Sequence, residues 1–514
     1  MFDPNRAHIR RLAALSAITL SLSIVLKTSS ARAQTDSAPE KGSLKVNWDK
    51  TLVVSRSTPT LQVVVNPMTA PGSPIHDATF TALKGLGADY VRYVPWLPYP
   101  QWAVAELKPP TAAGTSWDFK AIDPMTKDFL DATQGHPVIL NFSTMPAWLF
   151  KTDKPVTYPA DPAEPYWDYT QGTELVDPTG KQLGDYYGRL VSWYTNGGFT
   201  DENGARHDSG FHYSIPIWEV LNEPDFEHVT TPQQYTERYD DIVAGIRAVS
   251  PKTKFMGMAL AMPSRVPDYF EYFLNPKNHK PRIPIDYISY HFYASPSADQ
   301  TISDWQYTFF DQADGFLNTV RYAEAIRKRL SPETKVDLDE LGVILADGIG
   351  KVDAQHPFKP YPDAYWNLAG AMYAYIYIET ARMQIDIVGE SQLVGYPTQF
   401  PSVSMMDWNN GKPNARFWVL KLIKDNFGPG DKLVQTSLDN APSAAAQAFV
   451  TAKGNKLLLI NKHDRAVEVI LPEGSEHASA QAVDPTSGEG PARTIAVQNG
   501  SVKLEPFAVT VVTW

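Results

Sequence analysis

The chain has 514 residues, of which 43% are hydrophobic and 20% charged, a composition typical of a soluble globular protein with more than one domain. The formal net charge of −11 argues against nucleic acid or an anionic membrane as the main partner. The absence of cysteine excludes disulfides, thiolate catalysis and cysteine-based zinc sites.

The N-terminus has the layout of a secretory signal peptide. Three arginines precede the apolar run Leu12–Leu26, and a small-x-small cleavage site at Ala31–Ala33 precedes Gln34. An uncleaved membrane anchor is the alternative, but the run is shorter than the roughly 20 residues that span a bilayer. We therefore expect residues 1–33 to be removed, which leaves a formal charge of −15. The mature protein is expected to be secreted or periplasmic, with no membrane insertion.

Residues 61–427 alternate short β-rich runs with helical patterns, which predicts a (β/α)8 TIM barrel. The predicted strands are Leu61–Asn66, Ala88–Val94, Pro137–Phe142, Ile215–Asn222, Lys254–Met258, Asp286–His291, Lys335–Glu340 and Gln384–Gly389. The clearest predicted helices are Gly184–Tyr194, Tyr235–Val249, Phe316–Leu330, Ala364–Met383 and Ala415–Asn426. The long segment after the third strand, from Phe142 to Ile215, is expected to shape the substrate cleft.

The pattern changes after the last predicted helix. Residues 428–514 hold short strands separated by turns, which predicts a small C-terminal β-sandwich domain. The predicted strands there are Ala446–Thr451, Lys456–Asn461, Ala466–Leu471, Ala478–Asp484, Ala492–Gln498 and Ala508–Trp514. Residues 34–60 are read as a linker followed by one or two strands that can join this sandwich.

Two predicted strands end in carboxylates. Trp218–Pro224 carries Asn222 and Glu223 before a helix-breaking proline, and Lys335–Gly342 carries Glu340. In a barrel the C-terminal ends of the strands form the active-site face, and the fourth and seventh strands lie roughly opposite each other. Paired carboxylates at such positions suit hydrolysis of a glycosidic bond, in which one group protonates the leaving oxygen and the other attacks or activates water.

Both motifs resemble those of glycoside hydrolase clan A, the retaining glycosidases built on a (β/α)8 barrel. Trp218–Pro224 is most similar to family 39, the β-xylosidase and α-L-iduronidase group, in which the matching stretch is Trp-Glu-Val-Trp-Asn-Glu-Pro-Asn. This chain departs from that stretch at Leu221 and Asp225. Ser143–Trp148 resembles the third strand of family 30, and there is some family 5 character.

The resemblance implies roles for individual residues. Glu223 matches the general acid/base and Glu340 the nucleophile, while Asn222 matches the amide that hydrogen-bonds the sugar 2-hydroxyl. Asp339 is a rival nucleophile, but strand alternation is expected to point it away from the side that Glu340 faces. Glu219 is expected to lie lower in the barrel interior, in a structural network.

Other polar residues near strand ends are candidates for the same site. The resemblance implies that Arg92 hydrogen-bonds the nucleophile and keeps it ionised, with an ordinary salt bridge as the alternative. It also implies that, of His291 and Tyr293 at the end of the sixth strand, one positions the nucleophile and the other contacts substrate. A satisfied core histidine is the alternative for His291, and a metal role lacks a companion ligand set, so no metal is expected.

Tryptophan side chains can stack on the apolar faces of sugar rings. Trp148 follows the third strand and Trp408 follows the eighth, so both are candidate sugar-stacking walls, with an ordinary core position as the alternative for each. Trp96 and Trp102, after the second strand, are secondary candidates.

The sequence therefore predicts a secreted retaining glycosidase that acts on an oligosaccharide or polysaccharide, favours β-linked sugars and uses no cofactor. A non-catalytic carbohydrate-binding barrel and a transglycosylase are the alternatives. The sequence leaves open whether the enzyme is an exo-acting xylosidase, an endo-acting glycanase or an enzyme that acts on uronides. It also leaves the oligomeric state open. Fold alone does not determine the substrate.

Overall fold

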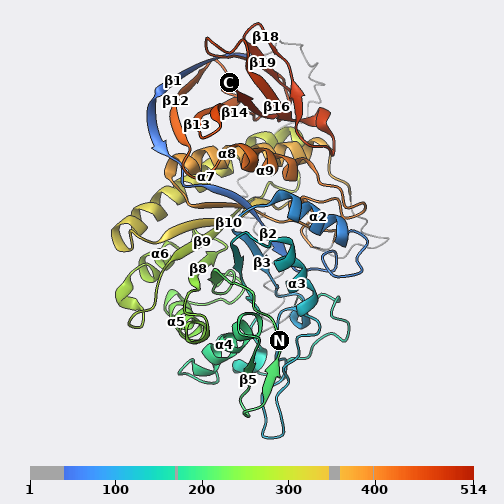
Figure 1. Ribbon diagram of the computed structural model, residues 1–514, viewed down its shortest axis with the longest axis vertical. Helices are drawn as coiled ribbons and strands as arrows, with labels where there is room; N and C mark the ends of the chain where they lie inside the picture. Colours follow the sequence, from blue (N-terminus) through green and yellow to red (C-terminus); the bar gives the residue numbers. More distant parts are fainter. Residues whose placement is uncertain (1–39, 168–171, 347–358, 398) are drawn as a thin grey trace, which may run out of the picture.

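The computed structural model describes residues 40–167, 172–346, 359–397 and 399–514, which form a barrel with a sheet-rich domain on one side (Figure 1). The predicted signal peptide over residues 1–33 lies outside the described residues and stays a prediction. Among the helices of the described residues, none combines the length and apolar composition that a bilayer crossing requires.

In the described part of the chain, eight parallel strands close into a barrel in the order β10-β11-β2-β3-β4-β7-β8-β9. They are β2 (Thr58–Val64), β3 (Val91–Val94), β4 (Val138–Leu140), β7 (Ile217–Glu219), β8 (Lys254–Leu260), β9 (Tyr287–Ala294), β10 (Lys335–Val343) and β11 (Ile387–Glu390). This arrangement confirms the predicted TIM barrel.

Two of the strand boundaries differ from the prediction because the backbone turns left-handed there. Strand β7 ends at Glu219, before the predicted end at Asn222, because Leu221 has a φ of 64° that extended backbone does not allow. Strand β11 begins at Ile387 because Gln384, the predicted first residue, has a φ of 63° and ends the preceding helix.

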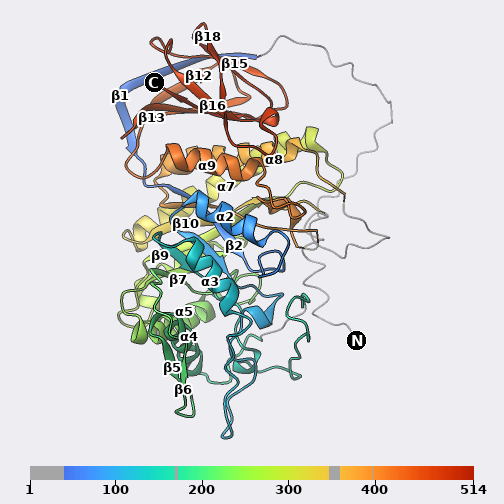
Figure 2. The ribbon, with the colours of Figure 1, turned by 45° about the vertical axis from the view of Figure 1, so that its right-hand side comes forward.

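Helices cover the outside of the barrel (Figure 2). They are α2 (His76–Leu86), α3 (Asp123–Ala132), α4 (Lys181–Thr195), α5 (Pro232–Val249), α6 (Pro267–Phe273), α7 (Ile302–Leu330), α8 (Ala364–Met383) and α9 (Ala415–Asn426). Helix α7 begins well before the predicted Phe316, because Thr301 and Asp304 form a capping box at its start. The Ser-Pro pairs that follow α5 and α7 mark both C-terminal ends as predicted.

The long segment after β4 contains α4 and a short hairpin of β5 (Gly198–Thr200) and β6 (Arg206–Asp208). Helix α4 packs directly on α5, and glycines let the two backbones approach closely. A Cβ atom on Gly245 would overlap the carbonyl oxygen of Gly184, and one on Gly188 would lie 2.9 Å from the carbonyl oxygen of Gly245. This contact holds the long segment after β4 against α5, the helix that follows β7 and its loop.

The C-terminal domain is a sheet of ten strands among the described residues, in the order β17-β16-β20-β14-β13-β12-β1-β15-β19-β18. They are β1 (Glu40–Val54), β12 (Lys432–Asp439), β13 (Ala444–Thr451), β14 (Gly454–Asn461), β15 (Val467–Ile470), β16 (Ser479–Val483), β17 (Arg493–Ile495), β18 (Val497–Gln498), β19 (Ser501–Leu504) and β20 (Val509–Thr513). Strand β1 pairs with β12 on one edge and β15 on the other, and so joins the two halves of the sandwich.

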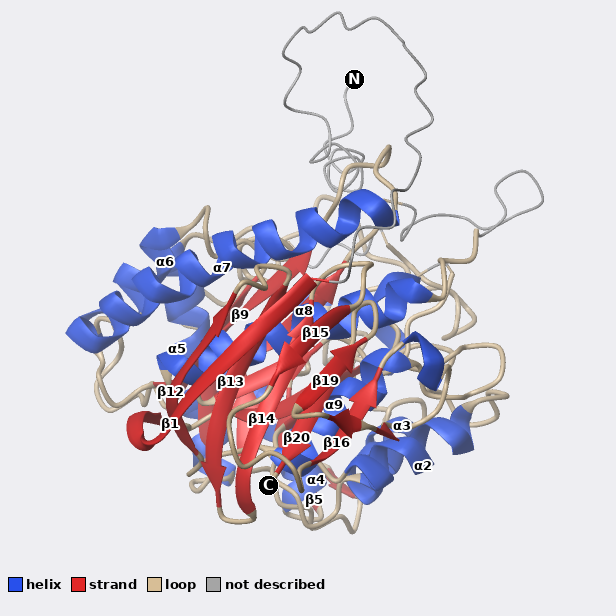
Figure 3. Ribbon diagram, turned by 90° about the horizontal axis from the view of Figure 1, so that it is seen from above, coloured by secondary structure: helices blue, strands red, loops and turns tan. Residues whose placement is uncertain are grey.

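The sequence analysis missed β12 and β19 in this sandwich. The sheet lies over α8 and α9 (Figure 3), and these two helices lie between it and the barrel (Figure 1). Phe427 stacks on Phe449 with ring centroids 4.5 Å apart, and the Trp418 indole N–H donates to the Glu489 carbonyl at 2.9 Å. The buried side chains on this face of the sheet belong to the same hydrophobic core as the barrel.

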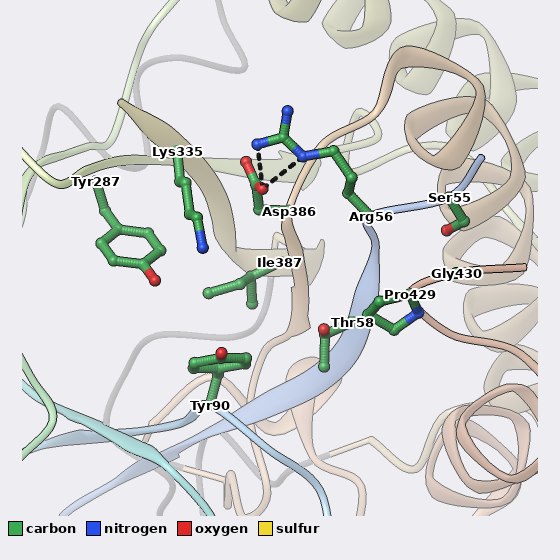
Figure 4. A pocket seen from close by; sticks show the side chains of 10 residues that line it. All are labelled: Ser55, Arg56, Thr58, Tyr90, Tyr287, Lys335, Asp386, Ile387, Pro429 and Gly430. Carbon is green, nitrogen blue, oxygen red and sulfur yellow. Dashed lines mark hydrogen bonds and ion pairs between the residues drawn. The ribbon is translucent and has the colours of Figure 1, made fainter. Parts of the chain in front are cut away.

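A pocket of about 380 Å³ opens at the N-terminal ends of the barrel strands (Figure 4). Arg56 lies there in an ion pair with Asp386, with Nη2 2.6 Å from Oδ1, and the Lys335 ammonium lies 5.5 Å from the centre of the Tyr287 ring. Residues at this end of a barrel usually contribute to stability, because the active site is formed by the loops at the opposite end.

The α4–α5 contact gives a stability prediction. Gly245→Ala should lower the free energy of unfolding by about 3 kcal/mol, because the new methyl group forces the two helix backbones apart. Gly315→Ala is the matched control, since Gly315 is an exposed helical glycine on α7 with open space around it. That variant should gain about 1 kcal/mol from helix propensity. Chemical denaturation measures both, and equal effects of the two substitutions would contradict the packing argument.

Candidate active site

Glu340 lies on β10 at the C-terminal face of the barrel, with its carboxylate held from two sides. Arg92 on β3 donates from Nη1 to Oε1 at 2.6 Å, and the Tyr293 hydroxyl on β9 donates to Oε2 at 2.5 Å. Only 9% of the side chain is exposed. Both neighbours donate, so the contacts suit a carboxylate that accepts hydrogen bonds through both oxygens.

Glu223 lies in the loop that follows β7, where the backbone is strained. Leu221 and Glu223 have φ angles of 64° and 44°, in the left-handed region that non-glycine residues seldom occupy. The Glu223 N–H donates to the Ala259 carbonyl at 3.0 Å, and the Asp225 carboxylate accepts from the backbone N–H groups of Ala261 and Met262, both at 2.9 Å. The loop after β8 therefore holds the unusual turn that presents Glu223.

His291 on β9 lies between the two glutamates. Its Nδ1 is 3.0 Å from Glu223 Oε1 and 3.5 Å from Glu340 Oε2. One carboxylate oxygen of each glutamate and one ring nitrogen of the histidine all lie within 4.8 Å of one another. The fold thus brings the two glutamates, more than a hundred positions apart in the sequence, to a single centre.

Arg92 forms the floor of this centre. The guanidinium is 1% exposed and donates to Glu219, Gln62, Glu340 and Asn222 over 2.5–2.7 Å. Glu219 lies deeper in the barrel, as expected from the sequence, and also accepts from Ser289 and Asn141. Burial raises the pKa of Glu219 to about 7, against the opposing charge of Arg92.

Asp339 faces the same network, so the predicted alternation that points it away from the side of Glu340 is wrong. Between Asp337 and Glu340, strand β10 advances three residues while β9 advances two, which is a β-bulge. The Asp339 carboxylate therefore lies 3.0 Å from Arg92 Nε and 3.5 Å from His291 Nε2. Burial opposes its ionisation, but these two cations lower the pKa of Asp339 to about 2.

The carboxyl groups have different electrostatic environments. Burial raises the pKa of Glu223 above its ordinary value, and the hydrogen bond from His291 opposes this shift only in part. Burial lowers the pKa of His291, but the charges of Glu340 and Asp339 outweigh it and raise that pKa well above 6.5. Among the described residues, Glu223, His291 and Glu340 have the spacing of a possible metal-ligand group.

Asn222 is held at both ends of its amide. The oxygen accepts from Arg92 Nη2 at 2.6 Å, and Nδ2 donates to Glu227 Oε1 at 3.1 Å. The same Glu227 oxygen accepts from the Trp96 indole N–H at 2.6 Å. The sequence analysis missed Glu227, although its spacing of four residues from Glu223 is that of neighbours on one helical turn.

Three partly exposed aromatic side chains gather beside Glu227, and we call them the aromatic cluster: Trp96, Trp167 and Phe400. The Trp96 ring centre lies 5.4 Å from that of Trp167 and 5.8 Å from that of Phe400, and the latter two are 6.3 Å apart. They come from the loops after β3, β4 and β11. Trp96, a secondary candidate in the sequence analysis, is joined to the polar centre by its hydrogen bond to Glu227.

The two tryptophans that the sequence favoured are placed differently. Trp148 directs its indole N–H to the Glu106 carbonyl at 2.8 Å, and it packs, partly buried, on the hydrophobic core. Trp408 also packs against that core with part of its surface exposed. Their proposed role as sugar-stacking walls stays a prediction.

Comparison with known families agrees with this geometry. The model of glycosyl hydrolases family 39 matches residues 34–340, which include the barrel up to Glu340. The C-terminal immunoglobulin-like domain of D-apionate lactonase matches residues 442–512, within the sandwich. A comparison with curated proteins found no match.

Solved structures with the same fold include other clan A enzymes. A family 51 arabinofuranosidase from Xanthomonas axonopodis pv. citri is 13% identical with a TM-score of 0.62. A family 30 endoxylanase from Clostridium papyrosolvens is 14% identical with a TM-score of 0.54, and an α-L-arabinofuranosidase from Thermotoga maritima is 14% identical with a TM-score of 0.58. Each alignment covers 92% of this chain and 99% of the other.

The family 39 match spans more than half of the chain, and the paired glutamates lie on a barrel of the fold that clan A shares. The resemblance noted in the sequence is thereby confirmed. The chain belongs to glycosyl hydrolase family 39 and is a glycosidase.

Proposed function

We propose that this glycosidase cleaves a β-linked O-glycosidic bond by double displacement, with retention of the anomeric configuration. The observation that carries the proposal is that one carboxylate oxygen of Glu223 lies within 4.8 Å of one carboxylate oxygen of Glu340. Retaining enzymes hold their carboxyl groups about 5–5.5 Å apart, whereas inverting enzymes leave about 6.5–9.5 Å for a water molecule between the acid and the base.

In the first step, Glu340 attacks the anomeric carbon while Glu223 donates its proton to the leaving oxygen. The C–O bond of the substrate breaks, and a glycosyl ester forms on Glu340. The raised pKa of Glu223 supports its role as the acid, because the group can then hold a proton in the free enzyme. Arg92 and Tyr293 hold the Glu340 carboxylate in place for the attack.

In the second step, Glu223 takes a proton from water, and the resulting hydroxide attacks the anomeric carbon. The ester bond breaks, Glu340 leaves as a carboxylate, and Glu223 is again protonated. His291 lies beside both carboxyl groups, so its ring N–H can donate a hydrogen bond to whichever of them is ionised. Asn222 supplies an N–H to the sugar 2-hydroxyl, a contact that strengthens in the transition state.

The preferred substrate in this proposal is a neutral β-linked sugar. The net charge of −11 gives no long-range attraction for a polyanion, and the aromatic cluster offers apolar faces for sugar rings. A panel of aryl glycosides should contain β-D-xyloside, β-D-glucoside, β-D-glucuronide and α-L-arabinofuranoside. The last belongs in the panel because two of the similar structures are those of arabinofuranosidases.

Azide rescue tests the two roles. Glu340→Ala should lower turnover of an aryl glycoside by about 10⁴-fold or more, since it removes the nucleophile. Glu223→Ala should lower it by about 10²–10⁴-fold for a poor leaving group, since it removes general acid catalysis. Azide should then give the anomerically inverted glycosyl azide with Glu340→Ala and the retained one with Glu223→Ala, as read by NMR.

The exposed acid Glu333 provides a control for these variants, because Glu333→Gln removes a carboxyl group just before β10, at the end of the strand away from the site. This variant should keep the wild-type reaction. Turnover like that of the wild type in Glu340→Ala or Glu223→Ala, or the same azide anomer from both, would contradict the assignment.

The pH dependence gives a second test. Glu223 must be protonated to act, so kcat/KM for a phenyl glycoside should be high below the raised pKa of Glu223 and fall about tenfold per pH unit above it. A 2,4-dinitrophenyl leaving group needs little protonation, so its kcat/KM should lose much less over the same range. If kcat/KM falls equally for the two substrates at alkaline pH, a group other than Glu223 causes that fall.

A further inference from the structure

Glu227 is a third carboxyl group in the cleft that the proposed reaction does not use. The N–H groups of Phe226 and Glu227 both donate to the Glu223 carbonyl, at 2.9 Å and 2.7 Å. The chain therefore makes one helical turn directly after the acid/base residue. Glu227 lies in the cleft near Glu223, because its carboxylate accepts from the amide of Asn222, the residue directly before Glu223.

The Glu227 carboxyl group joins two parts of the cleft through one oxygen. Oε1 accepts from the Asn222 amide at 3.1 Å and from the Trp96 indole at 2.6 Å. Oε2 is buried and has no hydrogen-bond partner among the described residues. Burial, followed by the nearby charge of Glu223, raises the pKa of Glu227 well above its ordinary value.

This bond determines how Asn222 is oriented. The amide oxygen is fixed by Arg92, and Glu227 takes one of the two N–H bonds at the other end. An amide has two N–H donors, so one is left for a substrate hydroxyl. Without Glu227, the nitrogen end of the amide would lose its protein anchor, and the side chain could rotate away from the orientation that a sugar hydroxyl requires.

The same bond fixes the aromatic cluster. Trp96 has its indole N–H on Glu227 and its ring against Trp167 and Phe400, which come from two other loops. A stacking platform contributes most when its ring is already held in the bound orientation. Glu227 thus connects Asn222, which is expected to bind the 2-hydroxyl, to the aromatic cluster, which is expected to bind the sugar face.

We propose that Glu227 is a positioning residue that orients Asn222 toward the sugar 2-hydroxyl and couples it to the Trp96 platform. The inference rests on the proposed function, because it assigns Glu227 to the site where the sugar next to the cleaved bond is held. Glu227 acts through Asn222 and Trp96.

Kinetics with matched substrates test this role. Glu227→Ala should lower kcat/KM about 100-fold on an aryl glycoside that carries the 2-hydroxyl, the loss expected when a reacting group is misplaced by about an ångström. On the corresponding 2-deoxy glycoside, which makes no contact with Asn222, the same substitution should cost only a few-fold through Trp96. Glu227→Gln should stay within about threefold of wild type, because its amide oxygen can accept the same two bonds.

Two further variants make the result specific. Asn222→Ala and Glu227→Ala should be strongly non-additive when combined, because they remove one interaction. Glu237→Ala, which removes an exposed glutamate from α5, is the control and should match wild type. If Glu227→Ala is poorly folded by thermal unfolding, Glu227→Gln and the 2-deoxy comparison in Trp96→Phe, which removes the N–H donor to Glu227 together with the five-membered ring, carry the same test.

The outcomes separate the two proposals. Turnover of any aryl glycoside by the wild type supports the proposed function independently of Glu227. An equal loss on 2-hydroxyl and 2-deoxy substrates, additive losses with Asn222→Ala, or wild-type kinetics in Glu227→Ala would each overturn the positioning role. Absence of turnover by the wild type across the substrate panel would overturn the proposed function and this inference with it.

Discussion

The buried guanidinium of Arg92 is the interaction on which the rest of the site depends. A charge inside a barrel costs several kcal/mol in desolvation unless acids and polar groups surround it. Glu219, Glu340 and Asn222 supply those partners from β7 and its following loop and from β10. Each of them is thereby fixed relative to the others, so a single cation sets the positions of the proposed nucleophile Glu340 and of the amide proposed to bind the 2-hydroxyl.

Similar carboxyl groups acquire different roles because their neighbours differ. Asp339 faces both cations and stays ionised, whereas Glu223 has a raised pKa despite its contact with His291. Glu340 is held by a cation and a hydroxyl, and Glu227 accepts only neutral donors in a buried setting. These four acids differ in chemistry by at most one methylene, so the different roles proposed for them follow from their surroundings. The proposed roles are counter-ion for Asp339, acid for Glu223, nucleophile for Glu340 and support for Glu227.

The sequence predicted the barrel, the sandwich and the central residues because these depend on periodic patterns and on motifs at strand ends. It could not predict features that depend on local irregularity or on long-range contact. The bulge in β10 reverses the direction expected for Asp339, and nothing in the residues around it signals the inserted position. Trp96 reaches the site through Glu227, a contact between loops far apart in the sequence. The early start of α7 at Thr301 was readable from its capping box.

Trapping of the covalent intermediate tests the central claim most directly. A 2-deoxy-2-fluoro glycoside with an activated leaving group slows both steps and lets the glycosyl-enzyme accumulate. We expect the intact protein to gain the mass of one fluoroglycosyl group, and peptide mapping to place it on Glu340. Because the bulge also turns Asp339 toward the centre, a label on Asp339, or turnover with no adduct and an inverted product, would contradict the account.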